Sequence, residues 1–351
     1  MQRDDRYDFY KGLLMFSVVF GHVITALANG ISIPSGIHVF VRTFDMPAFA
    51  FISGFFLRKS CRKHPFHVGV LNKIGSILFP AFLWSGIINI LLGDKFFSIG
   101  RLWFLWSIFF VSCVILIIDR IGQKVPLLKL PLFILAVILF HTIVIDPWNI
   151  GFLLFPAVVG YYDDELKMLF AKARSPRIAK LSIMLMFVIC LLFWSKEYNV
   201  WNAGCNILEP GAFIKIIFRG IIGVVGWFAV KIVYDYVYGK IQWHQSCVVR
   251  RIKGGLIRIG RTTLEIYILQ TIFVEFLGHT VVAKIVNFLG MNPFAVSPFL
   301  LTLVFAPIVT VCALVVMHMV NVVMKKLPGI GKYIYGITWV EAKQLFGGHL
   351  K

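Results

Sequence analysis

A lysine and a histidine near the start of the chain are spaced so that they can act on one ligand. Lys11 opens the first apolar segment, and His22 follows eleven residues later. In a helix, eleven residues return to within about 20° of the starting direction and rise about 16 Å, so both side chains share one face. A neutral imidazole accepts a proton readily, which makes His22 a candidate general base. The competing interpretation is a packed histidine that bonds to a neighbouring helix.

The second apolar segment carries further ionisable residues. His38, Arg42 and Asp45 are four and then three residues apart, which places them on one stripe of a helix. If this segment runs back across the same layer, Asp45 reaches a depth close to that of His22. Asp45 then either orients the His22 ring, as a carboxylate orients a catalytic imidazole, or neutralises Arg42. Further along, the small pair Ser53–Gly54 lets another chain or a ligand approach closely.

The elements that carry these residues are expected to cross a membrane. Hydrophobic residues make up 59% of the 351 residues, charged residues only 15%, and the mean hydropathy is +0.85. A soluble core cannot hide that much apolar surface, so lipid is expected to surround most of the chain. The net charge of +19 does not indicate a nucleic-acid binder, because Lys and Arg occur in short runs between apolar segments.

Ten apolar segments have the length, or nearly the length, needed to cross the hydrocarbon layer. They fall at 12–28, 37–57, 74–92, 102–118, 130–146, 149–162, 179–194, 212–235, 262–282 and 299–323. With a cytoplasmic N-terminus, most Lys and Arg fall in cytoplasmic loops, of which the longest are 163–178 and 236–261. The sequence predicts an all-α, polytopic membrane bundle of about ten helices with both termini cytoplasmic, forming one domain over 1–351.

Several kinds of site are not expected. The six cysteines form neither a CxxC pair nor a Cys/His metal pattern, so the sequence predicts no metal site and no disulfide framework. The first apolar segment lacks a cleavage site and is expected to remain as an anchor. Any chemistry is therefore expected inside the bundle or at its surface.

These residues and several later motifs resemble the acyltransferase-3 family of integral membrane O-acyltransferases, especially its fucose 4-O-acetylase-like subgroup. That family carries a basic residue, ten intervening residues and a histidine in its first helix, as Lys11 and His22 do here. Its second helix ends in a phenylalanine-rich run with Ser-Gly-Phe, as in FDMPAFAFISGFFL at 44–57. Further matches are Lys73 with FPAFLW at 79–84, LWFL at 102–105, and TLEIYILQ at 263–270.

The resemblance implies an enzyme that takes an acyl group, usually acetyl, from cytoplasmic acetyl-CoA or another acyl-CoA. The acceptor is a sugar hydroxyl of a lipid-linked or cell-surface glycan at the bacterial plasma membrane. The acyl-CoA is a co-substrate, and no bound cofactor is implied. His22 would be the catalytic base with Asp45 as its partner, and Lys11 and Lys73 would bind the donor. The candidate substrate or oxyanion contacts are Arg42, Ser53, Trp103, Glu265 and Tyr267.

Two positions depart from the family pattern. Family members often carry two basic residues three apart before the proline of the third helix, and here Ser76 stands in the second place after Lys73. This difference weakens or relocates a donor contact. The late motif commonly ends in histidine, which is Gln270 here, so a second histidine is not expected to be required.

Other interpretations stay open. Trp103 fits an aromatic belt at the membrane interface, and Glu265 can pair with Arg261 one turn before it. The chain as a whole would also suit a secondary transporter or a flippase of a glycan or lipid-linked glycan, since these proteins bury ionisable residues in their spans. A non-catalytic membrane scaffold or sensor is the second alternative to an enzyme.

Overall fold

The part of the chain that the structure describes is helical. The computed structural model describes residues 5–28, 35–91, 93, 100–142, 150–172, 175–194, 212–240, 246–276, 300–328, 333–338 and 341. The elements up to residue 142 are α1 (Asp5–Ala28), α2 (Ser35–Lys63), α3 (Phe66–Lys73), the π-helix η1 (Ile74–Leu78), α4 (Phe79–Leu91), the 3₁₀ turn η2 (Gly100–Leu102), α5 (Trp103–Lys124) and α6 (Pro126–Thr142). The later elements are α7 (Ile150–Tyr161), α8 (Asp163–Ala171), α9 (Pro176–Leu192), α10 (Ala212–Lys240), α11 (Cys247–Arg261), α12 (Thr263–Phe276), the π-helix η7 (Leu301–Phe305) and α15 (Ala306–Lys325).

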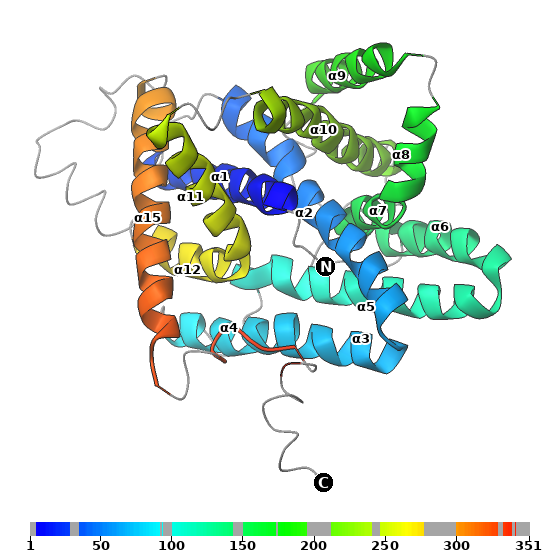
Figure 1. Ribbon diagram of the computed structural model, residues 1–351, viewed down its shortest axis with the longest axis horizontal. Helices are drawn as coiled ribbons and strands as arrows, with labels where there is room; N and C mark the ends of the chain where they lie inside the picture. The colour runs from blue at the N-terminus through cyan, green and yellow to red at the C-terminus, as the bar shows by residue number, and fades with distance from the viewer. Residues whose placement is uncertain are drawn as a thin grey trace, which may run out of the picture. The chain divides into compact units, whose positions relative to one another are not determined.

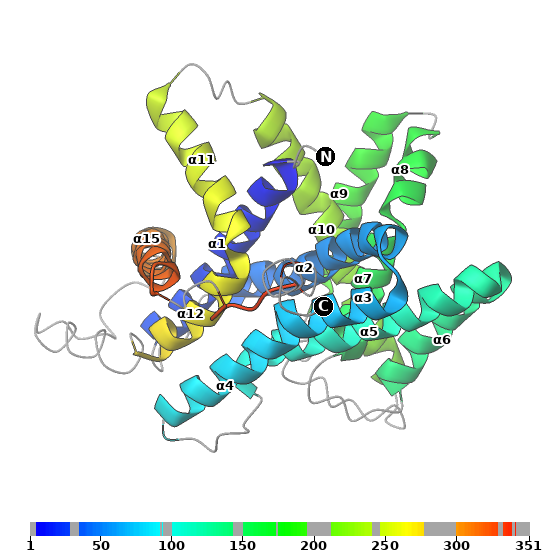
Figure 2. The same cartoon turned by 60° about the horizontal axis from the view of Figure 1, so that its bottom comes forward.

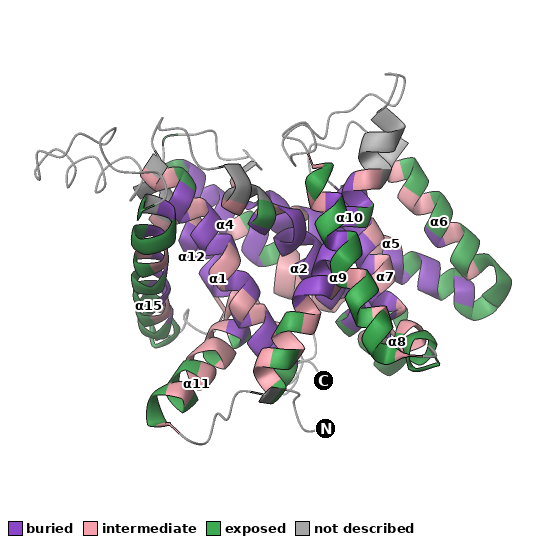
Figure 3. Cartoon of the chain, turned by 90° about the horizontal axis from the view of Figure 1, so that it is seen from above, coloured by how far each residue is buried: buried purple, intermediate pink, exposed green. Residues whose placement is uncertain are grey.

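Six described helical segments are long and apolar enough to cross a membrane. They are Asp5–Leu27, Phe40–Lys63, Phe66–Leu91, Trp103–Lys124, Phe218–Gly239 and Thr302–Lys325. On α15, one face is buried at Ala313 and Met317, whereas Val315, Met319 and Val323 are 53%, 62% and 63% exposed (Figure 3). Such apolar faces are stable against lipid rather than water. The predicted α-helical membrane bundle is thus confirmed, while the count of ten helices and the cytoplasmic termini stay predictions.

The chain divides into two compact units. The first comprises 1–45 and 230–331, and the second comprises 46–229 and 332–351. In the first unit, α1 packs on α11, α12 and α15, and α12 packs on α15 (Figure 1). This unit contains the helix that carries Lys11 and His22.

Two glycines let α1 and α11 approach until their backbones touch (Figure 2). A Cβ on Gly12 would overlap the carbonyl oxygen of Leu256, and one on Gly260 would overlap the carbonyl oxygen of Asp8. Small residues permit close packing of this kind inside a membrane, where van der Waals contact drives helix association. The contact fixes the first turns of α1 beside Lys11.

In the second unit, α3 lies beside α5, and α5, α6 and α7 pack on one another (Figure 2). The second half of α2 meets α7 through two glycines. A Cβ on Gly54 would overlap the carbonyl oxygen of Ala157, and one on Gly160 would overlap that of Phe51. The small pair Ser53–Gly54 predicts that another chain or a ligand can approach α2 closely. In the structure the segment that approaches is α7 of the same chain.

Both described π-helices lie directly before a helical proline. η1 is followed by Phe79 and Pro80, and η7 is followed by Ala306 and Pro307. Proline has no backbone N–H and its ring collides with the carbonyl four residues earlier, so the wider π-turn accommodates the ring. Lys73 ends α3 directly before η1, so it lies next to an irregular turn.

A short C-terminal segment lies against α4 and η1 (Figure 1). The indole N–H of Trp84 donates to the carbonyl of Ile334 at 2.8 Å, and its ring stacks on Tyr335 with centroids 5.6 Å apart. Gly336 has a φ of +83°, which suits glycine, and a Cβ there would overlap the carbonyl oxygen of Gly75. Gly336 in the segment and Gly75 in the span Phe66–Leu91 therefore allow the two backbones to pack closely.

Candidate functional site

The predicted base and the predicted donor-binding lysine lie on one uninterrupted helix. α1 runs from Asp5 to Ala28, so the spacing of eleven residues places Lys11 and His22 on the same face, about 16 Å apart. His22 is partly buried, and Lys11 has a side chain that is 19% exposed. The structure thus shows the continuous helix that the spacing of Lys11 and His22 requires, and their roles stay predictions.

The guanidinium of Arg42 lies against α1 at Gly21, the residue before His22. A Cβ on Gly21 would be 3.5 Å from Arg42 Nε and 3.8 Å from its Nη2, so the absence of a side chain at Gly21 makes room for the guanidinium. Arg42 Nη1 lies 3.9 Å from Oδ2 of Asp45, whose side chain is only 1% exposed. The structure thus brings Arg42 to the turn of α1 that holds His22, with the buried Asp45 carboxylate close to the same cation.

Lys11 is held at the start of α1 by a shared carboxylate. Lys11 Nζ lies 2.8 Å from Asp8 Oδ1, and the Asp8 side chain is 3% exposed. Arg261, the last residue of α11, reaches the same carboxylate through Nε at 3.4 Å and meets Asp5 Oδ1 at 2.7 Å. Sequence reasoning missed Asp8, although its position three residues before Lys11 was a usable signal.

The two candidates on α12 are buried. Glu265 Oε1 lies 2.5 Å from Nζ of Lys325, at the end of α15. The ion pair with Arg261 that the sequence suggested is not formed, because Arg261 pairs with Asp5. Tyr267 is 6% exposed, and its backbone carbonyl accepts a hydrogen bond from Thr271 Oγ1 at 3.3 Å. The ion pair gives Glu265 a structural partner.

The remaining candidates belong to the second unit. Ser53 is partly buried beside Gly54, and Lys73 is partly buried at the end of α3. Trp103 begins α5 and is 9% exposed, so its ring packs within the protein rather than facing lipid. The side chain of His38 lies outside the described residues.

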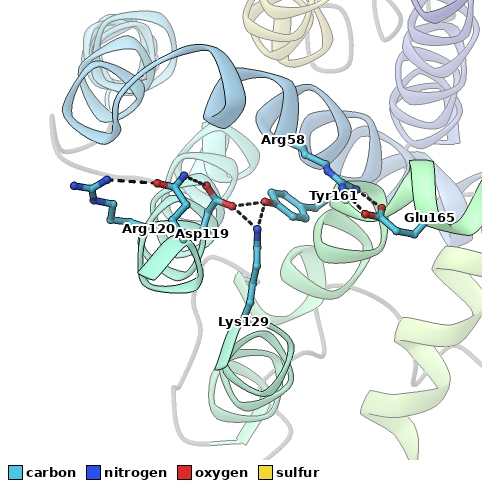
Figure 4. A network of polar contacts seen from close by, with 7 residues as sticks. Arg58, Asp119, Arg120, Lys129, Tyr161 and Glu165 are labelled. Carbon is cyan, nitrogen blue, oxygen red and sulfur yellow. Dashed lines mark hydrogen bonds and ion pairs between the residues drawn. The ribbon is translucent and has the colours of Figure 1, made fainter. Parts of the chain in front are cut away.

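A polar network that sequence reasoning missed joins several helix ends of the second unit (Figure 4). At its centre the Asp119 carboxylate accepts hydrogen bonds from Tyr161 and from Gln123 Nε2, the latter at 2.9 Å. Lys129 Nζ lies 2.5 Å from Asp119 and donates to the Tyr161 hydroxyl at 2.6 Å. An aspartate at the end of a long apolar run, with a lysine ten residues later, was the signal for this pair.

The network continues through α2 to α8. Arg58 donates to the backbone carbonyl of Tyr161 at 3.0 Å and forms a two-pronged ion pair with Glu165 (Figure 4). The Arg58 hydrogen bonds hold the pKa of Glu165 below its usual range. These charges compensate one another, so the network ties together the ends of α2, α5, α6, α7 and α8.

No group of three or more His, Cys, Asp and Glu residues in the described ranges could hold a metal ion. What the described residues offer is a partly buried histidine, an arginine at the same turn and a lysine at the end of the same helix. Burying an ionisable side chain in a membrane span costs free energy, so such side chains are retained mainly where they have a function. They are therefore characteristic of membrane enzymes and transporters.

Comparison with known proteins favours a membrane enzyme over a transporter. The acyltransferase-3 family model, described as an acyltransferase domain, matches residues 4–318, so the chain belongs to this family. A curated relative is the nodulation protein NolL of Mesorhizobium japonicum, which is 23% identical over 300 residues covering 76% of each chain. No solved structure matches. The resemblance inferred from the motifs is confirmed, and the protein is a membrane acyltransferase.

Proposed function

We propose that this protein is an O-acyltransferase of the bacterial plasma membrane. It would move an acyl group, most simply acetyl, from a cytoplasmic acyl-CoA to a sugar hydroxyl of a lipid-linked or cell-surface glycan. The family supports acyl transfer. The observation that carries the proposal is the single face of α1, which holds Lys11 near its start and His22 about 16 Å further along, with Arg42 against the preceding residue, Gly21.

His22 acts as the general base in this proposal. Its imidazole takes the proton of the sugar hydroxyl while the hydroxyl oxygen forms a bond to the thioester carbonyl carbon. The resulting tetrahedral oxyanion collapses, the carbon–sulfur bond breaks, and the CoA thiolate takes the proton from the imidazolium. The products are the sugar ester and free CoA, and His22 returns to its starting state.

Arg42 and Asp45 support this step. The Arg42 guanidinium, which lies beside the His22 turn, offers hydrogen bonds and positive charge to the developing oxyanion. The Asp45 carboxylate near Arg42 offsets that charge, and it orients the His22 ring when the imidazole becomes protonated. Tyr267 would supply a further hydroxyl donor to the oxyanion.

Other assignments rest on the resemblance. Lys73 would contact the donor phosphates, and Ser53 and Trp103 would contact substrate. Lys11 is better supported, because it lies at the end of α1 where a polyanionic donor would first meet the His22 face. Its ion pair with the buried Asp8 keeps it in place before donor arrives.

The test is acceptor-dependent release of CoA. The full chain, purified in nanodiscs, is incubated with acetyl-CoA and a broad panel of glycans and lipid-linked glycans, and the free thiol and acetylated products are measured. We expect thiol release only with a suitable acceptor, matched by one acetyl group per thiol. If no acceptor in the panel supports release while the protein moves a glycan across the bilayer, the transporter or flippase alternative replaces the proposal.

A further inference from the structure

Two buried amide side chains in the first unit lack the hydrogen bonds that such groups normally make. Gln270 on α12 is 2% exposed, and Asn321 on α15 is 1% exposed. Gln270 Oε1 and Asn321 Oδ1 are buried, and neither accepts a hydrogen bond from any residue that the structure describes. Buried polar atoms in proteins nearly always have a partner, because leaving a buried acceptor unsatisfied costs free energy. Amides of this kind are therefore candidates for contacts to a ligand.

Other buried polar side chains on the same two helices have partners. Glu265 on α12 pairs with Lys325 on α15. Thr310 on α15 is fully buried, and its Oγ1 donates a hydrogen bond to the carbonyl of Ala306 at 2.7 Å. The two helices thus satisfy other polar groups that they bury, and the two amides differ from these groups in having no partner within the described ranges.

Both amides lie a short way inward of the ion pair that joins α12 to α15. α12 begins at Thr263 and α15 ends at Lys325, so the pair between Glu265 and Lys325 joins the start of one helix to the end of the other. The rest of the contact between these helices therefore lies inward of that pair. Gln270 is five residues inward on α12 and Asn321 four residues inward on α15, which correspond to rises of about 7.5 and 6 Å. The two amides are thus buried at similar distances from one fixed point.

The helices that carry the amides also contact the helix that carries His22. α1 packs on both α12 and α15 (Figure 1). Gln270 lies three residues after Tyr267, a candidate oxyanion contact, so the two side chains lie about 60° apart on one side of α12. Asn321 lies one turn after Met317 on the buried face of α15, whose opposite face is exposed and apolar. The amides therefore face the interior of the first unit and not the lipid.

We propose that Gln270 and Asn321 bind hydroxyl groups of the acceptor sugar. The proposal rests on the proposed function, because it takes the acceptor to be a glycan. An uncharged amide offers a carbonyl acceptor and two N–H donors, and a sugar hydroxyl both donates and accepts, so the two groups complement each other. The phosphates of the donor would instead be bound by cations. Amides that are satisfied only when the acceptor is bound also favour it over a ligand that lacks the bonded hydroxyl.

Apolar replacements separate a binding role from a packing role. Gln270→Met and Asn321→Leu keep nearly the same side-chain size and remove the amide. Without ligand, the full chain in phosphatidylcholine nanodiscs should unfold at an unchanged temperature or about 2 °C higher, because an unsatisfied buried group has been removed. Met319→Leu changes a lipid-facing residue of α15 and should leave the unfolding midpoint unchanged. A lower midpoint in both amide variants would give the amides a structural role and overturn the proposal.

Methyl glycosides of hexoses and 6-deoxyhexoses are the probes for binding without donor. At least one glycoside should raise the unfolding midpoint of the wild type and of Met319→Leu. Gln270→Met and Asn321→Leu should each weaken its apparent affinity about tenfold or more, because each removes a hydrogen-bonding partner. The proposal is overturned if no glycoside shifts the wild-type midpoint, or if both amide variants bind with wild-type affinity.

Kinetics with an acceptor that supports CoA release separate this proposal from the proposed function. Gln270→Met should raise the acceptor KM about tenfold while the donor KM stays within about twofold of the wild type. An acceptor that lacks the bonded hydroxyl should be equally poor for the wild type and the variant, since the contact is already lost. An equal rise in both KM values would contradict an acceptor site. Glycoside binding that the amide variants lose, without acyl transfer to any acceptor, would uphold the site and overturn the proposed function.

Discussion

Gly260→Ala on α11 tests the backbone contact that holds α1 in place. A Cβ at this position would lie 1.7 Å from the carbonyl oxygen of Asp8 and 2.6 Å from its carbonyl carbon. Real Cβ atoms do not approach other heavy atoms closer than 3.0 Å, so the two helices must move apart by about 1.3 Å or more. Forcing such a group into a packed interface costs about 1–3 kcal/mol. Helix propensity acts in the opposite direction, because alanine is favoured over glycine by up to about 1 kcal/mol.

The matched control is Gly255→Ala. It lies on the same helix and gains the same propensity, but its Cβ would meet nothing within 4 Å. Equilibrium unfolding in mixed detergent, followed by circular dichroism, should show Gly260→Ala less stable than Gly255→Ala by about 1–3 kcal/mol. Because Asp8 belongs to this contact and pairs with Lys11, the donor KM should also rise in Gly260→Ala alone. Equal stability of the two variants would refute the close approach of α1 and α11.

Two further predictions concern the second unit. Gly336→Ala should destabilise the protein by about 1–3 kcal/mol more than Gly93→Ala, measured by the same unfolding assay, since both glycines have positive φ but only Gly336 meets a neighbouring backbone. Glu165 has a folded pKa depressed by Arg58, so its contribution to stability is present above its unfolded pKa of about 4.3 and is lost as the pH falls through the folded pKa. The thermal stability of Glu165→Gln should therefore fall below that of the wild type at pH 6 to 7. The difference should begin to shrink below the unfolded pKa of about 4.3 and vanish only below the folded pKa, and a constant difference would contradict the ion pair.

Hydrophobic patterning was enough to predict where helices lie. Each of the ten apolar segments overlaps a described helix, because runs of apolar residues in lipid must satisfy their backbone bonds internally, although only six described helices are long and apolar enough to cross a membrane. The same patterning does not reveal the π-turns at Ile74–Leu78 and Leu301–Phe305. These depend on how a proline ring meets the carbonyl four residues earlier, which is a local steric effect.

The two long basic segments were expected to be cytoplasmic loops, and each contains a helix. α8 occupies 163–171, and α11 occupies 247–261. A basic run is read as a loop because its charge opposes burial, but α11 is stabilised by packing one face on α1 through Gly12 and Gly260. That stabilisation comes from a residue pair far apart in sequence, so spacing within the segment could not disclose it.

The candidate site was predictable where its residues share one helix. Lys11 and His22 follow from helical geometry alone, whereas the partners of Lys11 and Glu265 depend on tertiary packing. The sequence offered Arg261 as the nearest cation to Glu265, yet Arg261 turns to Asp8 and Lys325 reaches Glu265 from α15. Ion pairs between helices are set by which ends meet, and no local pattern encodes that.

The rate of acetyl transfer by His22→Ala tests most directly whether His22 is the general base. Loss of a positioned general base should lower kcat about 10²- to 10⁴-fold while the donor KM stays close to that of the wild type. His318→Ala, which removes a partly buried histidine from α15, should keep its activity and serves as the matched control. Transfer by His22→Ala within about twofold of the wild-type rate, at equal expression, would contradict the assignment of His22 as the base.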